Sequence, residues 1–165
     1  LHDALPICER RQRPMGLVLL VHHGHAVEPG VDAMRPLSTP GRAACERLAA
    51  EVAHRGFVPD VIWHSGKLRA RQTVECYWKA CNPFAPMSAE RGLLPDDPAD
   101  WIRDRLIGDT RRILVGSHMP YLPRLLALML GAGAFSRVVF PLNGCVLLES
   151  NASAWQEIWR LDPHG

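Results

Sequence analysis

The chain shows two patterns of apolar and polar positions. Short continuous apolar runs, beginning with Leu-Val-Leu-Leu-Val at 17–21, are typical of strands buried on both faces of a parallel sheet. Apolar residues at helical spacing, such as Ala44, Leu48 and Val52, indicate amphipathic helices. The two patterns predict helices over 38–56, 67–80, 98–107 and 120–131, and strands over 17–21, 59–65, 111–117, 136–142, 144–150 and 154–161.

The order of these elements predicts the fold class. Strands that alternate with helices need crossover connections, which produce a mostly parallel sheet covered on both faces. We therefore expect an α/β chain, folded as a three-layer α/β/α sandwich with a mostly parallel central sheet and a closing hairpin. In the first helix Thr39 suits the N-cap, Pro40 the first turn and Gly56 the end, and the proline-rich stretch 82–100 is expected to be a loop.

The first fourteen residues differ from the rest of the chain. They have no periodicity, carry several arginines, and begin with "LHDALPI", which resembles translated adapter sequence. We predict that residues 1–14 are a non-native or disordered leader. Residues 15–165 are expected to form a single domain that starts at Met15.

Composition excludes several classes of function. The chain is 47% hydrophobic and 22% charged, as expected of a globular protein. Its net charge of +2 is too small to indicate nucleic acid or a membrane surface as a partner. No apolar run approaches the roughly 18 to 20 residues that span a bilayer. Five cysteines without a C-x-x-C pair favour a reduced, cytoplasmic chain.

Histidine and arginine residues follow the predicted strands. His22 and His23 come directly after the first strand, His118 follows the third, and Arg69 lies one turn into the helix after the second. Because the carboxyl ends of parallel strands meet at one edge of a sheet, these side chains should converge beside the start of the helix at 120–131. Imidazoles, a guanidinium and a helix N-terminus together predict a phosphate site.

Four segments resemble motifs of the histidine phosphatase (phosphoglycerate mutase-like) superfamily. "LVHHGHA" resembles its "LVRHG" signature, "RPLSTPGRAACERLA" resembles "RPLTxxGxxxA", "HSGKLRARQT" resembles "SPLxRAxQT", and "VGSHMP" resembles "xxSHxP". The matches extend from Leu17 to Pro120 in the family's order. The short chain is similar to the SixA-type phosphohistidine phosphatases. The resemblance implies a phosphoglycerate mutase-like fold.

The resemblance also implies roles for individual residues. His23 would be the nucleophile that accepts the phosphoryl group, Arg69 would bind the phosphoryl oxygens, and His118 would hydrogen-bond the same group. His22 and Gly24 would complete the substrate site, with no metal and no cofactor. The implied activity is hydrolysis of a phosphohistidine on a protein partner, such as a phosphotransfer domain or phosphocarrier, through a phosphohistidine enzyme intermediate.

Two alternatives stay open. One is a phosphatase of the same superfamily that acts on small phosphorylated metabolites. The other is a catalytically impaired phosphate-binding pseudoenzyme, because His22 stands where the family has arginine. If His22 contacts phosphate, binding should strengthen from about pH 8 to 6, and His22→Arg should raise turnover. If His22 points into the sheet, His22→Arg should destabilise the fold. Asp96 and Asp97 are candidate proton donors, or ordinary turn residues.

The remaining histidines have simpler interpretations. His25 is expected to face solvent from a loop, and His54 and His64 to be surface or structural residues. The spacing His23-x-His25 is also that of many metallohydrolases, so a metal site is a rival prediction. A chelator distinguishes the two enzyme classes, because only a metallohydrolase loses activity to it.

Overall fold

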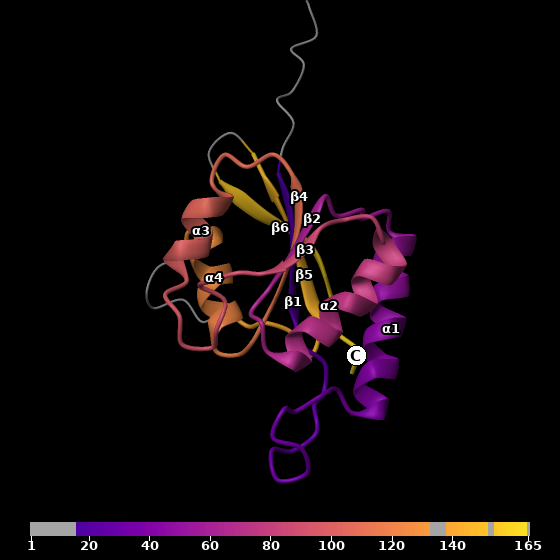
Figure 1. Ribbon diagram of the computed structural model, residues 1–165. Coiled ribbons are helices and arrows are strands. Elements are labelled where there is room, and N and C mark those ends of the chain that lie inside the picture. Colours follow the sequence, from indigo (N-terminus) through magenta and orange to yellow (C-terminus); the bar gives the residue numbers. More distant parts are fainter. Residues whose placement is uncertain (1–15, 133–137, 152–153, 165) are drawn as a thin grey trace, which may run out of the picture.

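A computed structural model describes residues 16–132, 138–151 and 154–164 (Figure 1). The predicted leader at 1–14 and the start of the strand predicted at 136–142 lie outside these residues. In chain order the elements are β1 (Leu17–His22), α1 (Thr39–His54), β2 (Val61–His64), α2 (Leu68–Cys81), β3 (Met87–Ala89), α3 (Asp100–Leu106), β4 (Arg112–Ser117), α4 (Tyr121–Met129), β5 (Cys145–Ser150) and β6 (Trp155–Leu161).

The six strands form one sheet in the order β3-β2-β4-β1-β5-β6. The four strands from β3 to β1 pair in parallel, whereas β5 runs antiparallel to β1 and forms a hairpin with β6. The predicted mostly parallel sheet and closing hairpin are therefore confirmed. None of the helices in the described parts of the chain is long and apolar enough to cross a membrane.

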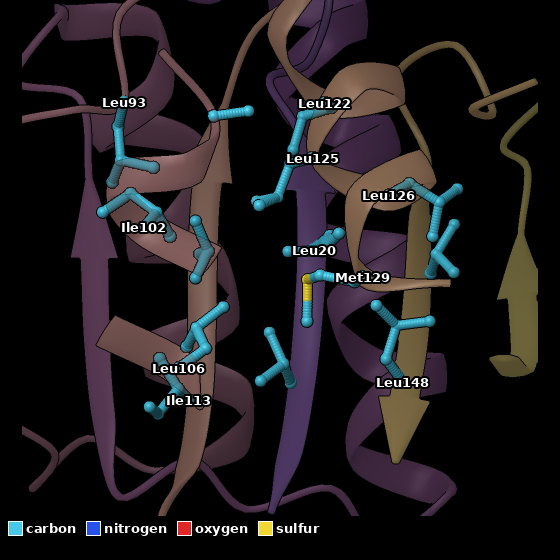
Figure 2. Packing of buried hydrophobic residues seen from close by; sticks show 14 of the residues in the cluster. Leu20, Leu93, Ile102, Leu106, Ile113, Leu122, Leu125, Leu126, Met129 and Leu148 are labelled. Atoms are coloured by element: carbon cyan, nitrogen blue, oxygen red, sulfur yellow. The ribbon is translucent and has the colours of Figure 1, made fainter. Parts of the chain in front are cut away.

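Helices cover both faces of the sheet, which confirms the predicted three-layer sandwich. In Figure 1, α1 and α2 lie on one side of the strands and α3 and α4 on the other. Successive side chains of a strand point to opposite faces, so β1 contributes to both cores. Val18 and Leu20 pack with α3 and α4 (Figure 2), while Leu19 and Val21 pack with α1 and α2.

Three local predictions are wrong. The N-cap of α1 is Ser38 rather than Thr39, because the Ser38 hydroxyl accepts the Gly41 N–H. The loop at 82–100 contains β3, a three-residue edge strand too short to show a periodicity. Residues 138–142 are not a strand. There Phe140 is buried in the core while Val139 and Leu142 are exposed, so this apolar run does not follow the alternation of a strand.

Strand register determines which loops meet at the carboxyl edge of the sheet. His22 at the end of β1 is paired with Ser117 at the end of β4. The pairing extends one residue further, since the His23 N–H donates to the Ser117 carbonyl at 3.2 Å. On the other side of β4, His64 of β2 is paired with Gly116. The segments that follow β1, β2 and β4 therefore begin side by side.

Candidate active site

The structure brings together His22, His23, His118 and Arg69, as strand order predicted. The ring centroids of His22 and His23 are 4.4 Å apart, and those of His23 and His118 are 5.1 Å apart. Arg69, in the first turn of α2, is close enough for its positive charge to lower the pKa of all three histidines. Three imidazoles and one guanidinium thus form a single cluster at the carboxyl edge.

One nitrogen of His23 is free for chemistry. Its Nδ1 lies 2.8 Å from the carbonyl oxygen of Gly24. A carbonyl can only accept, so Nδ1 carries the proton and Nε2 carries the lone pair. Nε2 has no hydrogen-bond partner among the described residues, and the side chain is only partly buried. Burial lowers the pKa of His23 to about 4, so the ring is neutral and Nε2 can act as a nucleophile at neutral pH.

His22 has the opposite tautomer. The main-chain N–H of Asn143 donates to its Nδ1 at 2.7 Å, so the proton of the neutral ring lies on Nε2. Burial, with repulsion by His23 and Arg69, lowers the pKa of His22 to about 3. The ring is therefore neutral between pH 6 and 8 in this environment. Burial and the neighbouring positive charges oppose the gain of charge predicted for His22 beside a phosphate, which stays a prediction.

His118 contacts Ser65, a serine of the "HSGKLRARQT" motif. Its Nε2 and the Ser65 hydroxyl are 2.6 Å apart, and its buried Nδ1 has no partner among the described residues. Burial is the largest cause that lowers the pKa of His118 to about 3, followed by the positive charges of its neighbours. Since none of the described residues supplies a partner for this buried Nδ1, a ligand or a water can do so.

Arg69 brings a positive charge that no described carboxylate neutralises. No acidic side chain among the described residues lies within salt-bridge distance of it, and its buried Nε has no hydrogen-bond partner. Burial and repulsion by Arg35 lower its pKa. A half-buried guanidinium without a counter-charge is costly unless an anion occupies the site.

Sequence reasoning missed Arg35 as a member of this cluster. The residue has a left-handed backbone (φ 49°), and its Nε donates to the Val27 carbonyl at 3.1 Å. Its charge acts on both His23 and Arg69, which places it beside the cluster. Arg35 could have been found from the sequence, because it begins the "RPLS" segment that resembles a family motif. The resemblance had implied no role for this arginine.

The "RARQT" segment of α2 makes hydrogen bonds to residues of two other motifs. Thr73 Oγ1 accepts the Gly24 N–H at 2.9 Å, and Gln72 Oε1 accepts the Leu37 N–H at 2.7 Å. Gly24 also packs so tightly that an added Cβ would clash with the Cys45 sulfur. Its N–H is therefore engaged by Thr73, and the substrate contact predicted for Gly24 stays a prediction.

Among the described residues, the other candidates make no hydrogen bond to the cluster, although His25 lies close enough for its charge to lower the pKa of His23. Asp97 sits in a turn, where its Oδ2 accepts the Leu94 N–H, and neighbouring Asp96 is exposed. His25 is exposed and bonds the Ser38 hydroxyl, and His54 is exposed at the end of α1, both as expected. His64 is buried and structural, with Nδ1 accepting the Gly66 N–H. In the described parts of the chain, no three His, Cys, Asp or Glu side chains are arranged to hold a metal.

Comparison with known proteins identifies the fold. No family model matches the sequence, and no curated protein matches it significantly. Solved structures do match. A protein histidine phosphatase SixA in complex with tungstate has 21% identity and a TM-score of 0.78, over 90% of this chain and 97% of that one. A protein assigned as the phosphohistidine phosphatase SixA of Agrobacterium tumefaciens has 24% identity and a TM-score of 0.74, over 89% and 97%.

A more distant enzyme has the same architecture. The phosphoglycerate mutase of Plasmodium falciparum has 16% identity and a TM-score of 0.71, over 89% of this chain and 91% of that one. All of these identities are below 25%, so the likeness concerns the fold. The chain has the phosphoglycerate mutase-like fold that SixA phosphohistidine phosphatases share.

Proposed function

We propose that this protein is a metal-independent phosphatase of the histidine phosphatase superfamily, of the SixA type, which hydrolyses a phosphohistidine on a protein partner. One observation carries the proposal. The lone pair on His23 Nε2 is free, in a neutral ring, beside a guanidinium that has no counter-charge among the described residues. A nucleophile next to a guanidinium that can bind an anion is the arrangement that phosphoryl transfer requires.

In the first step, His23 Nε2 attacks the phosphorus atom in line with the leaving group. A bond forms between Nε2 and phosphorus while the bond from phosphorus to the substrate nitrogen breaks. Arg69 binds the phosphoryl oxygens, and the His22 Nε2–H donates to them as a neutral group. Negative charge on these oxygens is then stabilised by donors already in place, which is the main contribution a protein makes to this reaction.

In the second step, water attacks the phosphorus of the enzyme intermediate. A bond forms between the water oxygen and phosphorus while the bond between His23 Nε2 and phosphorus breaks. The water's protons leave with the inorganic phosphate, and the neutral ring is restored. The Gly24 carbonyl keeps the proton on Nδ1 throughout, so the same nitrogen is presented in each cycle. His118, hydrogen-bonded to Ser65, borders the phosphoryl group on the side of β4.

The lack of a nearby acid supports the choice of substrate. Among the described residues, no Asp or Glu hydrogen-bonds to His22, His23 or His118, and no carboxylate is among the main charges acting on them. An alkyl phosphate needs a proton donor to release its alkoxide. A phosphohistidine protonated on its other ring nitrogen releases a neutral imidazole and needs none. The described residues of the cluster therefore favour a phosphoramidate over an alkyl phosphate.

Labelling tests the covalent step. The protein is incubated with a ³²P-labelled phosphohistidine protein, quenched in base and digested. Acid-labile, base-stable label is expected on His23. His23→Ala should carry no label and show no turnover, with an unchanged melting curve, while His25→Ala, two residues away on the exposed loop, should label normally. Hydrolysis by His23→Ala at the wild-type rate would refute the assignment.

A substrate panel tests the choice of phosphohistidine. The kcat/KM for a phosphohistidine protein is compared with values for phosphorylated sugars, phosphoglycerates and a phosphoserine protein. We expect the phosphohistidine protein to be preferred. Preference for a metabolite would instead support the small-molecule phosphatase. Tight phosphate binding with no labelled intermediate and no turnover would support a phosphate-binding pseudoenzyme.

A further inference from the structure

Asn143 contacts both signature histidines from a segment that none of the motifs includes. It lies in the turn before β5, 121 positions from His22 in the sequence. Its main-chain N–H donates to His22 Nδ1 at 2.7 Å, and its side-chain Nδ2 donates to the His23 carbonyl at 2.8 Å. The next residue adds a third contact, because the Gly144 carbonyl accepts the His22 N–H at 3.0 Å.

We propose that Asn143 is a positioning residue for the reaction at His23. This inference rests on the proposed function. Its main-chain N–H holds the proton of His22 on Nε2, and its side-chain amide anchors the backbone from which the His23 ring projects. It acts through the two histidines and need not touch the substrate.

The backbone conformation explains why this residue is asparagine. Asn143 has a φ of 54°, in the left-handed region that glycine, asparagine and aspartate tolerate best. Of these three, only asparagine has a side-chain N–H to donate to the His23 carbonyl. The orientation of the amide is not ambiguous, since that carbonyl can only accept. Oδ1 therefore points the other way, where it lies 3.2 Å from Nε2 of His164.

The contacts have a chemical consequence at each histidine. A main-chain N–H cannot accept a hydrogen bond, so it excludes the tautomer of His22 that carries its proton on Nδ1. His22 is left with a single N–H, on Nε2, for a bound phosphoryl group. At His23, the Asn143 side-chain amide restrains the peptide group between His23 and Gly24. The Gly24 carbonyl in turn keeps the proton of the His23 ring on Nδ1. One residue thus supports two rings with opposite proton positions.

Two substitutions of Asn143 distinguish a side chain that acts as a hydrogen-bond donor from one that only fills space. Asn143→Gly keeps the backbone conformation and the main-chain N–H, and removes only the side-chain bond. We expect kcat to fall about tenfold, the usual effect of losing one hydrogen bond of this kind. Asn143→Asp keeps the shape but turns a carboxylate oxygen toward the His23 carbonyl and puts negative charge beside the phosphate site. We expect kcat to fall on the order of a hundredfold.

The relative losses of kcat in Asn143→Gly and Asn143→Asp test the proposal. If Asn143 merely filled space, aspartate would be nearly harmless and glycine the worse substitution. The matched control is Asn82→Ala, which removes an amide-to-carbonyl bond of 2.8 Å to Pro59 at the far end of α2 from Arg69. This control should lower the melting temperature and leave kcat unchanged. Wild-type kcat in both Asn143 variants, a milder effect of aspartate than of glycine, or an equal loss of kcat in Asn82→Ala would overturn the proposal.

Nuclear magnetic resonance tests the tautomers without relying on turnover. In protein with ¹⁵N-labelled histidine and backbone, His22 should show an unprotonated Nδ1 coupled through the hydrogen bond to the Asn143 amide nitrogen. A proton on His22 Nδ1 would overturn the proposal whatever the kinetics. If the wild type hydrolyses no phosphorylated substrate, the proposed function fails, and this spectrum still decides whether Asn143 sets the tautomer.

Discussion

Lowering the pH should destabilise this protein through the three histidines of the cluster. Burial lowers the pKa of His22 to about 3, of His23 to about 4 and of His118 to about 3, from an ordinary value of 6.5. Between those values and 6.5 the unfolded chain binds more protons than the folded one. The free energy of unfolding therefore falls as the pH drops below 6.5, and this loss is complete only near pH 3.

The magnitude follows from the linkage between proton binding and folding. At pH 5, a histidine with a pKa of 6.5 when unfolded and about 3 to 4 when folded lowers the free energy of unfolding by about 2 kcal/mol. At pH 7.5 the same group contributes almost nothing. The three rings together lower stability on the order of 5 kcal/mol between these pH values, a large part of the roughly 5 to 15 kcal/mol that domains usually have.

Urea unfolding at pH 7.5 and 5.0 measures the effect, and variants assign it. His22→Gln keeps an acceptor for the Asn143 N–H and should reduce the pH dependence by about 2 kcal/mol, because one titrating ring is gone. His118→Asn should act similarly. His54→Gln, at the exposed end of α1, is the matched control and should keep the wild-type dependence. Equal pH dependence in the wild type and in both cluster variants would refute the claim that these rings fold in the neutral form.

Further predictions concern the packing and charge of the site. His22→Arg should lower the free energy of unfolding by about 2 to 4 kcal/mol in the absence of anions, because it leaves the Asn143 N–H without an acceptor and adds a cation beside Arg69. Urea titrations with and without tungstate should show that the anion restores this stability. A variant as stable as the wild type without anion would contradict the prediction. Arg69→Ala and His118→Ala should each lower kcat/KM on the order of a hundredfold, and near wild-type rates would exclude them from the site. Gly24→Ala should lose about 1 to 3 kcal/mol by thermal melting, and the double variant with Cys45→Ala should recover most of it, because the clash is with that sulfur.

Much of the fold could be predicted from local patterns. The apolar run of β1 and the helical spacing of Leu48 and Val52 in α1 reflect which side chains must be buried, and burial is encoded residue by residue. The same reasoning failed for residues 138–142, where the apolar residues divide between core and surface. It also missed β3, which is a strand only because its backbone pairs with β2. Pairing at a sheet edge depends on a neighbour that a short segment does not specify.

For the candidate site too, the sequence determined one part and the tertiary structure another. Strand order and the motif residues determined that His22, His23, His118 and Arg69 would meet, since the ends of parallel strands share one edge. The sequence could not determine where the protons lie. Taken alone, His22 is a histidine of ordinary pKa, and only the tertiary structure places it in a buried site against the N–H of Asn143. Protonation and tautomer depend on solvent exclusion and on the nearest donor or acceptor, and here that partner comes from the far end of the chain.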